Sequence, residues 1–220
     1  MPPQRVFVTG GTGYLGSRLI PLLLERGHHV TALVRPESKA RVPPGCAIAV
    51  GNPLDAASMA EHVQSGDTVV QLVGIPKPAP WKGPAFRAVD LVSVRATIEA
   101  AKAAGVAHVV YVSVAQPAPV MKAYIAVRSE GESRLRASGL RATILRPWYI
   151  LGPGHWWPVL LLPLYWLMER IPLTNASAQR LGLVNLRQML TALVWAVEHL
   201  PEKVSVIDVP EIRRLGSSER

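Results

Sequence analysis

The sequence predicts an α/β domain whose parallel sheet carries helices on both faces. Short apolar segments alternate with amphipathic segments through the first 150 residues of the 220-residue chain. The apolar segments show no regular alternation of polar and apolar residues, which is typical of strands buried on both faces. Because parallel strands need a crossover between them, this order of strands and helices favours a doubly wound sheet.

Each element has its own signal. The first strand is an apolar, β-branched run that ends at a glycine, and helical spacing of apolar residues follows it as far as Gly27. Asp55 is typical of a helix N-cap, and Gly105 of a helix end. The predicted strands are 5–10, 29–35, 46–52, 67–74, 108–114 and 141–147, and the predicted helices are 14–27, 55–64, 88–105 and 124–139.

The alternation ends after Pro147. We therefore expect residues 1–150 to form the main domain and residues 151–220 to form a small C-terminal lobe packed on it, with an apolar segment, a helix over 183–200 and a short strand over 204–210.

The apolar segment 156–168 reads "WWPVLLLPLYWLM" and carries no charge. It is too short, and too rich in proline, for a helix that spans a bilayer. Three interpretations stay open: buried core, the wall of a pocket for a large apolar substrate, or a patch that contacts a membrane surface or a partner subunit.

Composition excludes several function classes. The formal charge of +9 comes from dispersed basic residues, so no nucleic-acid surface is predicted, although the positive potential favours an anionic cofactor. Cys46 is the single cysteine and the six histidines are scattered, so neither a disulfide nor a metal site is expected. The start of the chain lacks the pattern of a signal peptide, which favours a cytoplasmic protein, with membrane association left open.

A glycine-rich turn follows the first strand. "VTGGTGYLG" places Gly10, Gly13 and Gly16 at spacings of three, between a strand and a helix. Glycines permit the tight turn and let backbone amides approach a pyrophosphate, and the helix N-terminus adds unpaired N–H groups. The residues predicted to hold the pyrophosphate are Gly10, Thr12, Gly13, Tyr14, Leu15 and Gly16.

The Thr-Gly-x-x-Gly-x-x-Gly form of this turn resembles the short-chain dehydrogenase/reductase superfamily. The likeness is to its extended and atypical branches, which include NmrA-like, epimerase-dehydratase-like and complex I accessory subunit-like proteins. Later segments are similar in the same order over about residues 5–152: "GNPLDAASM", "QLVG", "VDLVSVRATIEAAKAAGVAHVVYVSV" and "LRPWYILGPG". The resemblance implies a Rossmann fold that binds NAD(P).

The resemblance also implies which residues contact each part of the cofactor. It implies that Asn52, Pro53 and Leu54 lie at the adenine, that Leu72, Val73 and Gly74 lie at a ribose, and that Pro147 packs near the nicotinamide. Members that bind NAD usually carry an acidic residue near the end of the second strand. This chain has Arg35 there, and a guanidinium can pair with a 2′-phosphate, so NADP is expected, with NAD as the alternative.

The resemblance carries the family's catalytic tyrosine to Tyr124 and its serine to Ser113. The lysine position holds Arg128, which could contact the ribose and favour a tyrosinate, although a planar fork does not replace an ammonium. Asp90 stands where many members have asparagine, so the proton path is expected to differ.

Two functions therefore stay open. One is an NADP-dependent oxidoreductase acting on a hydrophobic carbonyl or hydroxyl substrate. The other is a non-catalytic NADP-binding redox sensor or an assembly or accessory subunit, and a helix 124–139 with no chemistry would suit it. A homodimer is common in the family and is a further expectation.

Overall fold

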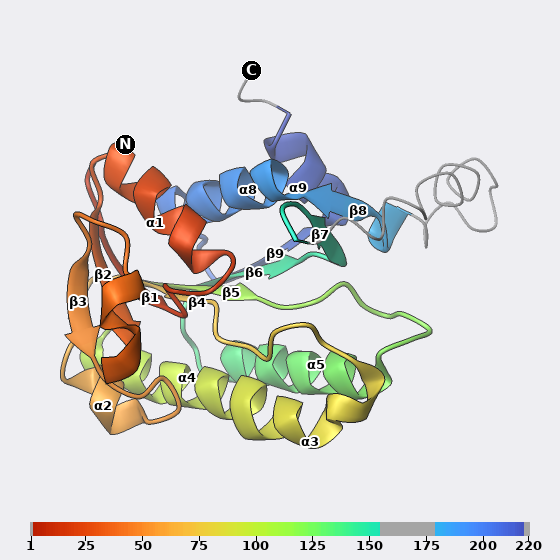
Figure 1. The fold of residues 1–220 in the computed structure, drawn as a ribbon, viewed down its shortest axis with the longest axis horizontal. Helices are drawn as coiled ribbons and strands as arrows, with labels where there is room; N and C mark the ends of the chain where they lie inside the picture. The colour runs from red at the N-terminus through yellow and green to blue at the C-terminus, as the bar shows by residue number, and fades with distance from the viewer. Residues whose placement is uncertain (1, 155–178, 218–220) are drawn as a thin grey trace.

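A seven-stranded parallel sheet lies at the centre of the computed structural model, which describes residues 2–154 and 179–217 (Figure 1). The strand order is β3-β2-β1-β4-β5-β6-β9, and every neighbouring pair in it runs parallel. These strands are β1 (Arg5–Thr9), β2 (His29–Val34), β3 (Ala47–Val50), β4 (Thr68–Gln71), β5 (His108–Val112), β6 (Ala142–Arg146) and β9 (Val204–Asp208). The predicted doubly wound parallel sheet is confirmed.

Helices cover both faces of this sheet (Figure 1). One layer holds α1 (Gly16–Glu25), α8 (Leu186–Glu198) and α9 (Val209–Leu215), and the opposite layer holds α2 (Ala56–Ala60), α3 (Gly83–Ala85), α4 (Val92–Ala104) and α5 (Lys122–Ala137). The short turns are η1 (Pro36–Arg41), η2 (Pro80–Lys82) and the π-helical turn η3 (Phe86–Leu91), which runs directly into α4.

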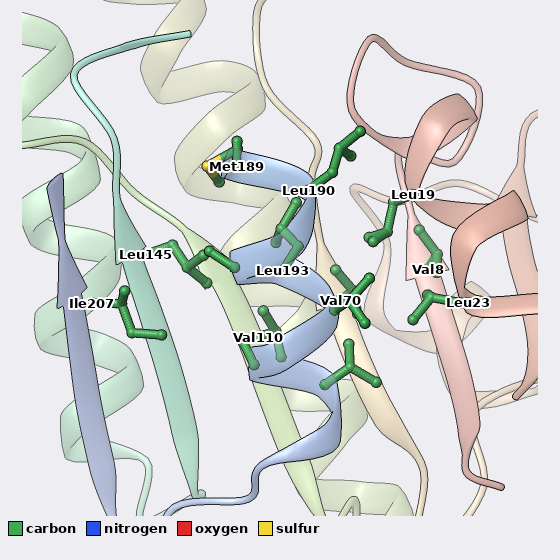
Figure 2. Close-up of a cluster of buried hydrophobic side chains, with 14 of the residues drawn as sticks. Val8, Leu19, Leu23, Val70, Val110, Leu145, Met189, Leu190, Leu193 and Ile207 are labelled. Carbon is green, nitrogen blue, oxygen red and sulfur yellow. The ribbon is translucent and has the colours of Figure 1, made fainter. Parts of the chain in front are cut away.

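Side chains from α1 and α8 fill one core. Figure 2 shows Leu190 and Leu193 of α8 near Val70 and Val110 of the sheet, with Leu19 of α1 beside them. Burial removes these apolar surfaces from water, which stabilises the fold by about 25 cal/mol for each Å². The residues after 150 thus contribute both a covering helix and the strand β9 to one common core.

The start of the predicted helix 183–200 is corrected by the structure. Residues Leu183–Asn185 form strand β8, which pairs in parallel with β7 (Tyr149–Leu151). The helix begins only at Leu186, because the Asn185 side chain accepts a hydrogen bond from the Gln188 backbone N–H at 2.8 Å. The Gln188 side-chain oxygen in turn accepts from the Asn185 backbone N–H at 3.0 Å.

The predicted strand 204–210 also ends early. It stops at Asp208, and Val209 begins α9, in which Pro210 occupies a first-turn position that tolerates proline. The apolar segment 156–168 lies outside the described residues. No helix within residues 2–154 and 179–217 is long and apolar enough to span a bilayer.

A histidine lies inside the sheet. His108 on β5 is fully buried, and its Nε2 lies 2.9 Å from the hydroxyl of Thr143 on β6. Burial, assisted by the charge of Arg141, lowers the pKa of His108 from 6.5 to about 4. The folded protein therefore holds a neutral imidazole at a pH where the unfolded chain takes up a proton.

We expect the free energy of unfolding to fall as the pH drops from 6.5 toward 4, because the unfolded state then binds one more proton than the folded state. A pKa difference of this size corresponds to about 3 kcal/mol. Urea unfolding of wild type and His108→Gln over this pH range measures the effect. The slope should shrink in His108→Gln and persist in a control at the exposed His29, His29→Gln; equal slopes in the two variants would contradict the assignment.

Candidate cofactor and catalytic site

The chain changes direction in the sheet between β1 and β4. From β1 it moves outward through β2 and β3, and then returns to build β4, β5, β6 and β9 on the other side. In sheets of this kind, ligands bind in the crevice at the carboxyl ends of the strands where the order reverses. The glycine turn after β1 and residues 72–74 after β4 lie at this point.

The glycine turn is too tight for side chains. Gly10 has φ 77°, and a Cβ there would lie 3.0 Å from the carbonyl carbon of Leu72. A Cβ on Gly16 would overlap the carbonyl oxygen of Gly10, and the Gly13 N–H donates to that same oxygen at 3.0 Å. The following helix α1 begins without a side-chain cap. A close backbone cradle before an uncapped helix fits a pyrophosphate.

Tyr14 ties this turn to the segment after β7. Its ring lies under the guanidinium of Arg18, whose central carbon is 4.5 Å from the ring centroid, and Arg18 donates to the Tyr14 carbonyl at 2.8 Å. A Cβ on Gly152 would overlap the Tyr14 hydroxyl, so the two segments are in contact. Leu15 packs against the core beneath the turn, and Thr12 is half-buried within it.

The residues predicted to meet the adenosine half of the cofactor follow β2 and β3. The Arg35 side chain is 62% exposed, and its Nε lies 3.2 Å from a carboxylate oxygen of Glu37. The Asn52 side chain accepts from the Leu54 N–H at 3.0 Å, which shapes the turn that contains Pro53. These side chains lie at the same edge of the sheet as the glycine turn, and their contacts with a cofactor remain predictions.

The end of β4 links the glycine turn to the predicted catalytic helix. Gly10 meets the backbone of Leu72 and Val73, and a Cβ on Gly74 would overlap the terminal nitrogen Nη2 of Arg128 on α5. The predicted ribose segment therefore lies directly between the two.

Arg128 is buried and ion-paired. Its Nη2 lies 2.6 Å from the Oδ1 of Asp90 on η3, and its Nη1 donates to the carbonyl of Val112 at the end of β5 at 2.9 Å. Burial raises the pKa of the Asp90 carboxyl, and the Arg128 guanidinium offsets part of that rise. Burial alone would lower the pKa of Arg128, but the neighbouring Tyr124, Tyr111 and Asp90 raise it above its usual range. The guanidinium stays charged, with Asp90 as its counter-ion.

Tyr124 lies beside this pair. The central carbon of the Arg128 guanidinium is 5.2 Å from the centroid of the Tyr124 ring, and the Phe86 ring centroid is 4.9 Å away on a tilted plane. The side chain is half-buried, and its hydroxyl makes no hydrogen bond to any residue that the structure describes. The ring is thus fixed by packing while the hydroxyl stays available to a bound molecule.

Ser113 is engaged by a buried carboxylate. Its hydroxyl donates to Glu132 at 2.6 Å, and Gln116 donates to the same oxygen at 2.9 Å. Arg146 forms a two-point ion pair with Glu132 at 2.9 and 2.5 Å. Pro147 is buried next to Arg146, and its carbonyl accepts from the Ala115 N–H at 3.0 Å. Ser113 can still accept a hydrogen bond, but its proton is held by Glu132.

The structure brings Tyr124, Arg128 and Asp90 together, with Gly74 against the arginine. Sequence reasoning missed that Asp90 is the counter-ion of Arg128 and that Gly74 makes room for it. It also missed Glu132, although a charged residue four positions after Arg128, on the same face of a helix, was a usable signal.

Within residues 2–154 and 179–217, no group of three histidine, cysteine or acidic side chains could hold a metal ion.

A family model described as NAD(P)H-binding matches residues 10–153, more than half of the chain. The chain belongs to this NAD(P)H-binding family. The match confirms the NAD(P)-binding domain that the glycine turn and the resemblance predicted.

Curated relatives of this NAD(P)H-binding chain include two reductases. A ceramide reductase of Caulobacter vibrioides is 28% identical over 96% of this chain, and a 3-diazoavenalumate denitrifying reductase of a Streptomyces species is 30% identical over 69%. The chain spans 66% and 58% of the length of these two relatives.

Among solved structures, the Bordetella bronchiseptica enzyme WbmH in complex with NAD+ has a TM-score of 0.70 and 20% identity, and the match covers 99% of this chain and 81% of that one. At this identity the likeness supports the fold alone.

We predict that Asp90→Asn destabilises the protein by about 3–5 kcal/mol, because it leaves the Arg128 charge buried without its carboxylate. Arg128→Met in the Asp90→Asn background should recover part of the loss. Denaturant unfolding of the single and double variants measures the coupling. As a control, Glu130→Gln breaks the surface pairs with Arg134 and Arg87 and should cost at most about 1 kcal/mol. A loss in Asp90→Asn no larger than in this control would refute the buried pair.

Proposed function

We propose that the chain is an NADP(H)-dependent oxidoreductase that acts on a carbonyl or hydroxyl group of a hydrophobic substrate. The observation that carries the proposal is the available hydroxyl of Tyr124, held by its ring on α5. Arg128 lies beside that ring and contacts Gly74. The two residues before Gly74, Leu72 and Val73, contact Gly10 of the phosphate turn. A proton donor thus lies close to a cradle suited to a dinucleotide.

When bound, a nicotinamide cofactor supplies or accepts a hydride. The turn from Gly10 to Gly16 would hold its pyrophosphate, and the exposed Arg35 would meet a 2′-phosphate, with Glu37 as its partner in the free protein. NAD remains the alternative.

Tyr124 would give its hydroxyl proton to the substrate oxygen during reduction and take one during oxidation. Arg128 would support it by packing on the ring, while Asp90 neutralises most of the arginine charge. Ser113 would orient a hydroxyl substrate by accepting its hydrogen bond. It would not donate to a carbonyl, because Glu132 already takes its proton. The predicted ribose contact of Arg128 would use its remaining N–H groups. Val112 and Asp90 take one N–H from each terminal nitrogen, and Nε has no partner among the described residues.

The hydrophobic character of the substrate rests on two supports. A ceramide reductase is among the relatives that match nearly the whole chain, and its name describes a lipid substrate for that protein. The uncharged segment 156–168 would supply an apolar wall for a similar acyl chain.

A second candidate function is cofactor binding without turnover, in a redox sensor or an accessory subunit. The pairing of Arg128 with Asp90 and of Ser113 with Glu132 favours it, because each predicted catalytic group other than Tyr124 is engaged by a carboxylate. The two candidates share the cofactor site and differ only in whether Tyr124 transfers a proton.

For cofactor choice, we expect Arg35→Glu to weaken NADPH binding roughly ten- to a hundredfold, and NADH binding by less than threefold, because only NADPH presents a phosphate to this side chain. Isothermal titration with each cofactor measures both constants. Lys39→Glu makes the same charge change at an exposed position four residues away. It should leave the ratio of the NADPH and NADH dissociation constants unchanged. Equal losses for both cofactors in Arg35→Glu would contradict the 2′-phosphate contact.

For turnover, Tyr124→Phe should lower the rate of NADPH oxidation with long-chain ketones roughly a hundredfold or more, while the NADPH dissociation constant stays within twofold of wild type. The phenyl ring keeps the packing on Phe86 and Arg128, and the substitution removes only the hydroxyl group. Stopped-flow or steady-state absorbance of NADPH follows the reaction. Turnover that survives in Tyr124→Phe would exclude the tyrosine as the proton donor. If wild type binds the cofactor but shows no turnover, the second candidate function is favoured.

A further inference from the structure

Two loops at the carboxyl edge of the sheet present large apolar side chains to solvent. Trp81 on η2 is 80% exposed, and Val120 in the loop before α5 is 55% exposed. In Figure 1 the loop that follows β4 and the loop that follows β5 converge beside the start of α5. The helices that follow these loops are in contact at their first residues, because a Cβ on Gly83 of α3 would lie 3.5 Å from the Cβ of Ala123 of α5. An aromatic side chain this exposed favours a partner that covers it.

Prolines restrict both loops. Residues 75–85 and 115–121 together contain six of them: Pro76, Pro78, Pro80, Pro84, Pro117 and Pro119. The Lys82 ammonium also closes the first loop, because it donates to the carbonyls of Pro76 and Lys77 at 3.1 and 2.9 Å. A restricted loop loses less conformational entropy on docking, so Trp81 is presented outward at low cost.

The same loops carry positive charge and no acidic residue. No aspartate or glutamate occurs in residues 75–89 or 115–129. Arg87 is compensated by Glu130. Lys77 and Lys122 are exposed and form no ion pair with a described residue, and Lys82 donates only to carbonyls. The surface around Trp81 is therefore cationic.

We propose that this surface, made of Trp81, Val120, Lys77, Lys82 and Lys122, docks on an anionic lipid bilayer. Tryptophan is enriched at the boundary between headgroups and hydrocarbon, and clustered lysines are attracted to anionic headgroups. A protein partner of the usual interface size would need more apolar area than two side chains supply. Docking here places Tyr124, two residues after Lys122, beside the membrane surface. The docking goes beyond the proposed oxidoreductase function and does not require turnover.

The test is sedimentation of the full chain with vesicles of phosphatidylcholine alone or with about one third phosphatidylglycerol. Wild type should bind the anionic vesicles, and binding should weaken as salt screens the lysines. Trp81→Ala and Lys77→Glu/Lys122→Glu should each lower the partition coefficient roughly tenfold.

Two matched controls accompany these variants. Leu200→Ala removes an exposed apolar side chain elsewhere, and Lys102→Glu/Lys203→Glu makes the same charge change away from the loops. Both should bind like wild type. Thermal unfolding and NADPH titration should be unchanged in all four variants, which separates a failure of docking from a failure of the cofactor site.

Three results would overturn the proposal. Wild type could fail to bind anionic vesicles. Binding could survive in both loop variants, which would assign it to another segment such as 156–168. The two controls could lose binding as strongly as the loop variants, which would reduce the effect to net charge.

Discussion

The site depends on a steric constraint: at three positions the backbone approaches its neighbour too closely for any side chain. Gly10 lies against Leu72 and Val73, Gly16 lies against Gly10, and Gly74 lies against Arg128. The first two contacts fold the phosphate turn onto the end of β4, and the third lets an arginine from α5 reach across to η3. A side chain at Gly10 or Gly16 would displace the phosphate turn, and a side chain at Gly74 would displace the Arg128 guanidinium.

Arg128 and Glu132 lie one helical turn apart on α5, and both are buried. Each is neutralised by a residue from another element, Asp90 from η3 for the arginine and Arg146 from β6 for the glutamate. Pairs of this kind contribute little net stability, because desolvation offsets much of their attraction. The pairs do fix the orientation of α5, since a shift of this helix would leave buried charges without their partners. The helix that carries Tyr124 is thereby held in one position.

The features that sequence predicted well are the local ones. The glycine spacing, the two-sided burial of strands and the ends of helices are encoded within a few residues, so the sheet and the phosphate turn could be predicted. The partner of Arg128 could not, because Asp90 is 38 residues away and only the fold brings the two together. The same limit explains Leu183–Asn185, where pairing with β7 overrides helical spacing. Whether a buried arginine serves catalysis or structure depends on such distant partners.

The edge strand β9 is synthesised long after its neighbour β6. β9 completes the sheet by pairing with β6, and its Val204 lies opposite Ala142, 62 residues earlier in the chain. While a ribosome makes the intervening residues, β6 is the outermost strand, with an open row of backbone hydrogen-bonding groups and an apolar face not yet covered by α8. The growing chain is therefore most prone to aggregation just after its cofactor half has emerged.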